Sequence, residues 1–257
     1  MSLHRALATD LGRALRCRPL QLYLVVQVLA AAVYVVRRDE ITLAMVLLIW
    51  LGLALLAFVA WWSGRHPAAR PQPDRVPAAG PRVGFAMLAV VGGVVSTASS
   101  VAGGVLILGG VGGWAWVAIR NGGLGRLGEK LTRDPRPFLG LFLLIGLPRL
   151  LVVGPAFIVD VGLALPSGVG QQLALLIGLF APLEAWSRRP AWAAVAAAAI
   201  FALLHVELTM EANDNDLIAT CANVVLYQAS VGLIAILAFT RHRAAVPIGV
   251  THAMAIA

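Results

Sequence analysis

The chain has 257 residues, of which 60% are hydrophobic and 12% are charged, and its formal net charge is +8. A soluble domain is nearer half apolar and a quarter charged, so this composition excludes one water-soluble core and predicts a polytopic membrane protein. The basic residues lie in short segments between apolar runs, with no basic patch interleaved with aromatic residues. That distribution is typical of membrane topology, so we expect the lipid bilayer as a partner and no nucleic acid.

The first apolar run, 20–36, follows a segment with four arginines at 1–18. Such an order is found in signal peptides, but the run ends at Arg37 and Arg38 instead of a small-residue cleavage site. We therefore expect a retained first span. The two cysteines form no CxxC pair, which argues against a disulfide framework and a thiolate zinc site.

Further apolar runs follow to the end of the sequence. A spanning helix needs about 20 apolar residues, with a range of roughly 17 to 25. By this rule the candidate spans are 20–36, 41–62, 83–96, 102–119, 138–159, 168–186, 191–206, 217–239 and 244–257. The fold class predicted is an all-α, polytopic transmembrane helical bundle with about nine spans.

The charges between these spans predict their orientation. With nine spans and a cytoplasmic N-terminus, the outer segments hold only two arginines, Arg37 and Arg38. The outer segment 207–216 is instead acidic. The positive-inside rule therefore favours this topology, in what we expect to be a bacterial plasma membrane.

Composition also divides the chain. Residues 1–62 hold the first two candidate spans, and 63–82 contain five prolines, as in an extended basic linker. Residues 83–167 hold the middle spans, and 168–257 hold the last four. The motif GxGxxG occurs at 123–128, but it follows no strand and opens no βαβ unit, so it does not indicate nucleotide binding.

Two histidines lie in the apolar C-terminal part. A titratable group inside a bilayer is costly and therefore marks a candidate functional site. The topology puts His205 and His252 at similar depth in the outer leaflet, together with Gln171 and Gln172. The alternative is two unrelated histidines, each hydrogen-bonded to helix backbone.

An imidazole can act as a base or a metal ligand near neutral pH. Catalytic zinc has three protein ligands plus water, so His205 and His252 would need a third ligand, such as Glu207 or Glu211. Other charges have local explanations as well as functional ones. Arg149 either faces a cavity or pairs with backbone, and Glu184, four residues before Arg188, predicts a helical ion pair.

Phe201-Ala202-Leu203-Leu204-His205, followed by Pro247 and His252-Ala253, resembles the CPBP family. These are CAAX-processing and bacteriocin-processing intramembrane proteases, also called type II CAAX prenyl endopeptidase-like or Abi proteins. The resemblance covers about 168–257. It implies a membrane metalloendopeptidase, a divalent metal such as zinc, and a membrane-embedded or lipidated peptide as substrate.

The family pattern is an acidic Glu-Glu-xxx-Arg motif, then FxxxH, then HxxxN or HxxxD. Phe201 and His205 match the second motif, and His252 the third, with Ile256 where the family has a polar residue. By topology the acidic pair aligns with Gln171-Gln172, so these two and the histidines are the candidate catalytic residues. A second alignment uses Glu184 with Arg189, in the other leaflet.

Glutamine has nearly the shape of glutamate but cannot take up a proton at neutral pH, as a general base must. Three interpretations remain open. The chain is an intramembrane endopeptidase of this type, weakened by the glutamines; or a non-catalytic family member that binds a partner or peptide; or a small-solute transporter that uses Arg149 and the histidines. A transporter often has inverted repeats, and we find no internal repeat.

Overall fold

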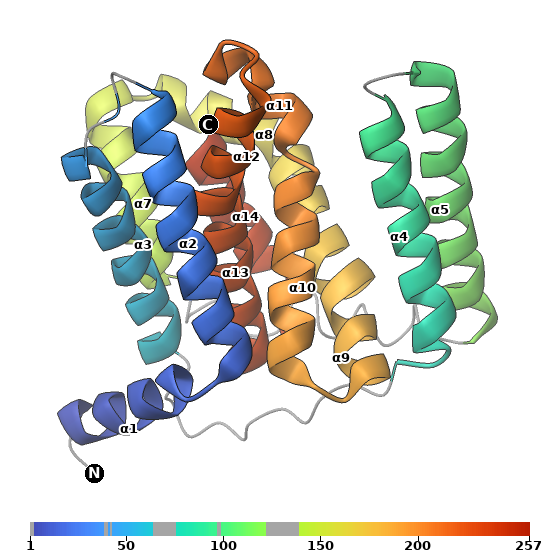
Figure 1. Ribbon diagram of the computed structural model, residues 1–257, viewed down its shortest axis with the longest axis horizontal. Helices are drawn as coiled ribbons and strands as arrows, with labels where there is room; N and C mark the ends of the chain where they lie inside the picture. The colour runs from blue at the N-terminus through green and yellow to red at the C-terminus, as the bar shows by residue number, and fades with distance from the viewer. Residues whose placement is uncertain (1–2, 39–40, 42, 64–75, 97–98, 122–138) are drawn as a thin grey trace.

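The computed structural model describes residues 3–38, 41, 43–63, 76–96, 99–121 and 139–257. All regular structure in these ranges is helical, which confirms the predicted all-α class (Figure 1). The linker residues 64–75 and the GxGxxG segment lie outside the described residues.

The described residues up to 121 form five helices, of which the first lies across the lower end of the bundle (Figure 1). This short helix has leucines four residues apart on an exposed face, at Leu7, Leu11 and Leu15. The five helices are α1 (Leu3–Leu15), α2 (Arg18–Arg37), α3 (Leu43–Ser63), α4 (Ala79–Ser96) and α5 (Ser100–Arg120). We did not predict α1 as a separate element, because its arginines, Arg5 and Arg13, belong to the basic segment that precedes the first apolar run.

The C-terminal half forms the body of the bundle. Its helices are α7 (Leu139–Val153), α8 (Ala156–Leu173), the π-helix η2 (Ala174–Phe180), α9 (Ala181–Ser187), α10 (Pro190–Leu203), α11 (Val206–Met210), the 3-10 turn η3 (Glu211–Asn213), α12 (Leu217–Leu226), α13 (Gln228–His242) and α14 (Val246–Ile256). The main core lies where η2, α9, α10, α13 and α14 meet. Phe180 and Phe239 pack there edge to face, with ring centroids 6.2 Å apart.

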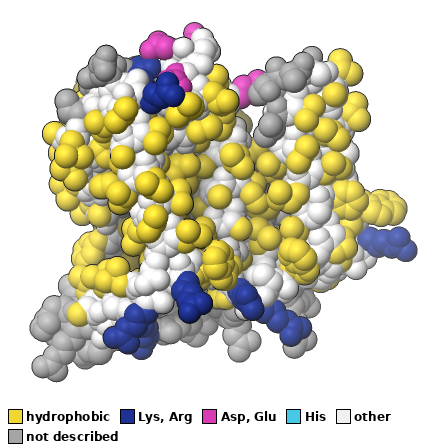
Figure 2. Space-filling model, viewed as in Figure 1, with side chains coloured by type: hydrophobic (Ala, Val, Ile, Leu, Met, Phe, Trp, Pro, Cys, Tyr) yellow, Lys and Arg dark blue, Asp and Glu magenta, His cyan; other side chains and the backbone are white. Residues whose placement is uncertain are grey.

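Several helices are long and apolar enough to cross a membrane. Within the described residues these are Arg18–Arg37, Leu43–Trp61, Val101–Arg120, Ala156–Ser187 and Leu217–His242. A sixth is added if Pro190–Leu203 and Val206–Asn213, which meet at a bend of 57°, count as one span. Figure 2 shows hydrophobic side chains over the middle of the molecule, most Lys and Arg along its lower edge, and Asp and Glu at its top together with a few Lys or Arg. These features indicate a membrane protein.

The boundaries differ from the sequence prediction around 138–159, which we expected to be one helix. The chain breaks at Gly154, whose φ of +77° suits glycine, and Pro155 follows it. The next helix therefore begins at Ala156 and continues through η2 and α9 to Ser187. This continuous helix carries Gln171 and Gln172 past the C-terminal helix.

Glycines let α8 and α14 cross at close range. A Cβ at Gly168 would lie 2.5 Å from the backbone nitrogen of Ala253, and one at Gly249 would lie 2.6 Å from the Cα of Val169. Small residues at such crossings let membrane helices approach closely. The crossing brings the turn after Gly168 beside His252.

The prediction of an ion pair between Glu184 and Arg188 is wrong. Arg243 binds both carboxylate oxygens of Glu184, at 2.9 Å and 3.3 Å, and both side chains are buried. Arg188 is exposed at the end of α9. A bidentate guanidinium from another helix satisfies a buried carboxylate better than an exposed neighbour on its own helix.

Candidate functional site

His205 lies at the break between α10 and α11, where the regular backbone hydrogen bonds of α10 end. Its Nδ1 lies 2.7 Å from the carbonyl oxygen of Phe201, one turn earlier. A carbonyl can only accept, so Nδ1 carries a proton and donates to it. In the neutral ring this leaves Nε2 with a lone pair directed away from α10.

Phe201 explains the spacing of FxxxH in physical terms. Its carbonyl oxygen fixes His205, and its buried ring packs against both histidines. Ring centroids lie 4.5 Å apart for Phe201 and His205, and 6.2 Å apart for Phe201 and His252. One residue thus positions the first imidazole and supports the second.

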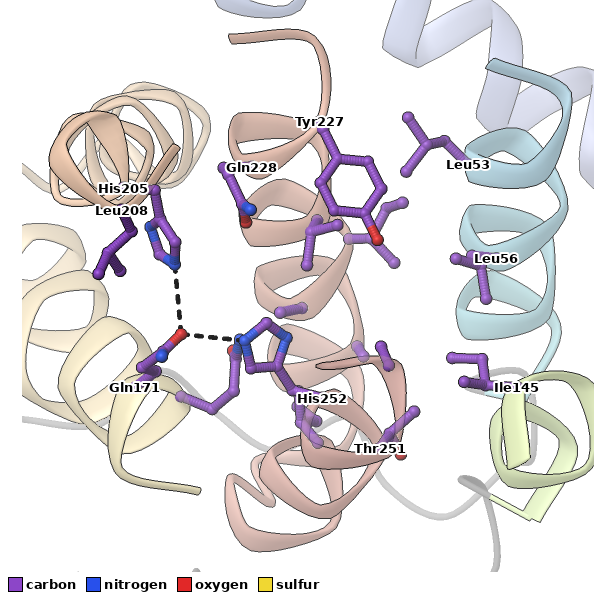
Figure 3. A pocket seen from close by; sticks show the side chains of 17 residues that line it. Leu53, Leu56, Ile145, Gln171, His205, Leu208, Tyr227, Gln228, Thr251 and His252 are labelled. Atoms are coloured by element: carbon purple, nitrogen blue, oxygen red, sulfur yellow. Dashed lines mark hydrogen bonds between the residues drawn. The ribbon is translucent and has the colours of Figure 1, made fainter. Parts of the chain in front are cut away.

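Gln171 joins the two histidines, as Figure 3 shows. Its Oε1 lies 3.3 Å from Nε2 of His205 and 3.0 Å from Nε2 of His252. The site therefore combines α8, the α10–α11 junction and α14. Three of the four residues that the sequence placed at one depth meet at a single amide.

The protonation of His205 determines which way that amide points. With Nδ1 donating to Phe201, a neutral His205 offers only a lone pair at Nε2 and needs a donor opposite it. In the structure, however, the amide oxygen of Gln171 faces both Nε2 atoms, and its NH2 group donates to the hydroxyl of Ser167 at 3.0 Å. A neutral His205 would therefore require the amide to be turned, with its NH2 group toward the histidines. In neither orientation can Gln171 remove a proton from water.

Gln172 does not join this group. It is fully buried, yet neither its amide nitrogen nor its amide oxygen has a hydrogen-bond partner. Successive helix residues point about 100° apart, so only one of the two glutamines can face the histidines. We predicted that both glutamines belong to the site, although helix periodicity already indicates that neighbouring side chains point in different directions.

The acidic loop does not complete a metal site. Glu207 and Glu211 are exposed, and neither lines the cavities beside the histidines. Among the described residues, no three His, Cys, Asp or Glu side chains lie close enough to hold a metal ion. Two imidazoles and one neutral amide oxygen do not fit a catalytic zinc centre, which has three His, Cys or carboxylate ligands. The predicted set of His205, His252 and Glu207 is therefore not assembled here.

Two cavities meet at the Gln171–His205 contact. One, of about 240 Å³, lies between α3, α7, α8, α13 and α14 and is shown in Figure 3. The other, of about 680 Å³, lies between the α4–α5 hairpin and η2. Gln171, His205 and Leu208 line both cavities. The other residues around the larger cavity are apolar, whereas the smaller cavity is also lined by Gln172, Gln228, Thr251 and His252.

The π-helix directly after the glutamines was not predicted. Trp114 of α5 donates its indole N–H to the carbonyl oxygen of Gly178, at 3.1 Å, and so binds the hairpin to η2. Such π segments are often found at functional sites. No periodicity in an apolar run reports a single widened turn, so the sequence carried no signal for it.

Two charged residues belong elsewhere. Arg149 donates to the carbonyl oxygen of Met254, at 3.4 Å, which corresponds to the backbone-paired interpretation rather than a solute pathway. Glu184 is held by Arg243 and lines neither cavity. This pairing leaves Gln171, not Glu184, beside the histidines.

Comparison with protein-family models, with curated proteins and with solved structures gives no match for this chain.

Proposed function

We propose that this chain is a divergent CPBP-like intramembrane protein that binds a peptide segment beside His205 and His252, and that Gln171 disables hydrolysis. The observation that supports this proposal is the meeting of both imidazole Nε2 atoms at one side-chain amide. In the resembled family, a glutamate is expected at that position.

Hydrolysis needs a group that removes a proton from water as its oxygen attacks the peptide carbonyl. The C–N bond then breaks, and a proton passes to the leaving nitrogen. Glu would accept the first proton and deliver the second, whereas Gln does neither. A cavity that retains the histidines without the carboxylate is suited to binding rather than cleavage.

We also propose that the chain crosses a bacterial plasma membrane nine times and that its N-terminus is cytoplasmic. The shorter apolar helices Ala79–Gly93 and Val246–Ala255 support this number, because each packs along a longer apolar helix, α5 and α8 respectively. The acidic residues at the upper end and the basic residues at the lower end support the orientation.

The test is Gln171→Glu, measured in proteoliposomes with a library of fluorescein-labelled apolar peptides. We expect cleavage to rise by roughly 10²- to 10⁴-fold, which is the usual contribution of a general base. The same substitution completes a His-His-Glu set, so zinc affinity measured by titration calorimetry should also rise. The matched control for the zinc measurement is Gln172→Glu, which has the same chemistry one residue away and should leave zinc affinity unchanged.

Adding His205→Ala to Gln171→Glu should abolish both gains. Cleavage by the unmodified chain at the rate of Gln171→Glu would overturn the proposed loss of hydrolysis. A Gln171→Glu protein with neither cleavage nor added zinc affinity would overturn the resemblance as a guide to function.

A further inference from the structure

Gln172 is a buried polar group that the protein itself does not satisfy. It has no exposed surface, and both ends of its amide lack partners, yet it lines the smaller cavity. Leaving such a group unpaired costs stability, and an apolar residue of the same shape would avoid that cost. The amide has no accessible surface in this arrangement, so a ligand in the adjoining cavity becomes its partner when the Gln172 side chain turns toward that cavity.

The amide offers one donor direction and one acceptor direction side by side. In an extended peptide, the N–H and C=O of one residue point to the same side, which is how paired strands exchange two hydrogen bonds. A helical segment has its N–H and C=O groups bonded within the helix and offers nothing to exchange. Gln172 therefore matches an extended residue and not a helical one.

A second group in the cavity supports this orientation. The Oε1 atom of Gln228, at the start of α13, is buried without a partner and lines the same cavity. It can accept an N–H from a residue beside the one at Gln172. The other lining residues are mostly apolar, among them Leu53, Leu56 and Ile145, and they suit the side chains of an apolar segment.

We propose that the cavity binds an apolar peptide in extended form, with one residue exchanging its N–H and C=O with the amide of Gln172. This assignment depends on the proposed function, since it names how that peptide is held. It places recognition at Gln172 and leaves Gln171 to the histidines. The two neighbouring glutamines thus have separate tasks.

The test measures binding of the acetylated and amidated hexapeptide (Leu-Ala)3 to the full chain in nanodiscs. Gln172→Met removes both hydrogen bonds and keeps the length of the side chain. We expect its Kd to rise at least about tenfold, as the loss of two hydrogen bonds implies. The melting temperature of the unbound protein should stay the same or rise, because an unpaired amide has been removed.

Gln27→Met is the matched control. Gln27 is also a buried glutamine, but it donates to the carbonyl oxygen of Val225 at 2.6 Å and lies outside the cavity. Its replacement should lower the melting temperature and leave the Kd unchanged. A loss of affinity confined to Gln172→Met is therefore not a general effect of the substitution.

Replacing single peptide groups of the probe by esters locates the contact. One ester position should weaken binding to the unmodified chain and have no effect in Gln172→Met. If the unmodified chain binds no hexapeptide, the proposed function fails. If it binds and Gln172→Met binds equally well, only the assignment of Gln172 fails. Acetamide binding as tight as that of the hexapeptide would also overturn the assignment, in favour of a small amide ligand.

Discussion

Glu184 and Arg243 show how much a single buried contact contributes at the lower end of the bundle. Arg243→Met would leave the Glu184 carboxylate buried without its partner, and we expect a loss of about 3–5 kcal/mol in unfolding free energy. Position 243 has a left-handed backbone, with φ of 51°, and methionine keeps that strain unchanged. Denaturant unfolding in detergent measures the loss.

Arg188→Gln is the matched control for that pair, since Arg188 is exposed and should change stability by less than about 0.5 kcal/mol. Replacing both partners, as Glu184→Leu with Arg243→Met, should recover most of the stability lost in Arg243→Met. If the double variant is as unstable as the single one, the ion pair is not the source of the loss.

The sequence predicted which residues meet at the candidate site better than it predicted the partners of buried charged residues. His205, His252 and Gln171 could be placed together because the ends of spanning helices share a leaflet. The partner of Glu184 could not, because Arg243 is 59 residues away and sequence rules describe only neighbours on one helix. That Gln171 contacts the histidines and Gln172 does not depends on the direction of each side chain, which only the structure shows.

The α8–α14 crossing is the element-scale feature that assembles the site. Gly168→Ala would place a Cβ 2.5 Å from the backbone of Ala253, and backbone cannot move aside as a flexible side chain can. We expect a loss of about 1–3 kcal/mol, the usual cost of overpacking, and weaker peptide binding as His252 moves from Gln171. Thermal unfolding and the hexapeptide Kd report these two effects.

Gly170 provides a control on the same helix, because a Cβ there meets nothing within 4 Å. Gly170→Ala should leave binding unchanged and hold or slightly raise stability, since alanine favours the helix. Equal behaviour of the two alanine variants would contradict the role of close packing at Gly168.

Asp216 caps α12 and makes the start of that helix sensitive to pH. Its carboxylate accepts from the N–H groups of Ile218 and Ala219, at 2.8 Å and 3.1 Å. The bond from Ala219, followed by that from Ile218, lowers the pKa of Asp216. Its contribution to stability is therefore present above the usual aspartate range and lost as pH falls through the lowered pKa.

Asp216→Asn tests this cap, because asparagine also caps helices but does not titrate. If the cap depends on hydrogen bonding alone, the two proteins should have equal melting temperatures near neutral pH. Below pH 4 the unmodified chain should lose more of its melting temperature than Asp216→Asn. Parallel pH profiles would show that Asp216 does not couple folding to pH.

The presence of a helix could be predicted where apolar runs are long, but the residues at which helices end could not be predicted as well. The break at Gly154 and Pro155 was hidden inside an apolar run, since neither residue lowers hydropathy enough to divide it. The widened turn of η2 accepts a hydrogen bond from Trp114 of another helix. The first feature comes from local backbone chemistry and the second includes a tertiary contact, and neither changes the apolar pattern of the sequence.

The proposed orientation of the whole molecule in the membrane depends on charge asymmetry. The basic lower edge and the acidic upper end lie on opposite sides of the apolar middle (Figure 2). Anionic lipids and the insertion machinery favour basic segments on the cytoplasmic side. We therefore expect Cys17, between α1 and α2, and Ala212, in the acidic segment, to lie on opposite sides of the membrane.

Accessibility to a membrane-impermeant maleimide tests this expectation in intact cells. Cys17 in a Cys221→Ser background should react only after the membrane is permeabilised. Ala212→Cys, with both native cysteines replaced by serine, should react without permeabilisation, because residue 212 is exposed and the proposed topology puts it on the outer side. Reaction of both sites on one side would require an even number of crossings between them, which contradicts the seven that nine spans place there. The reverse pattern would keep the number of spans and invert the orientation, so basic segments would face outward against the charge rule.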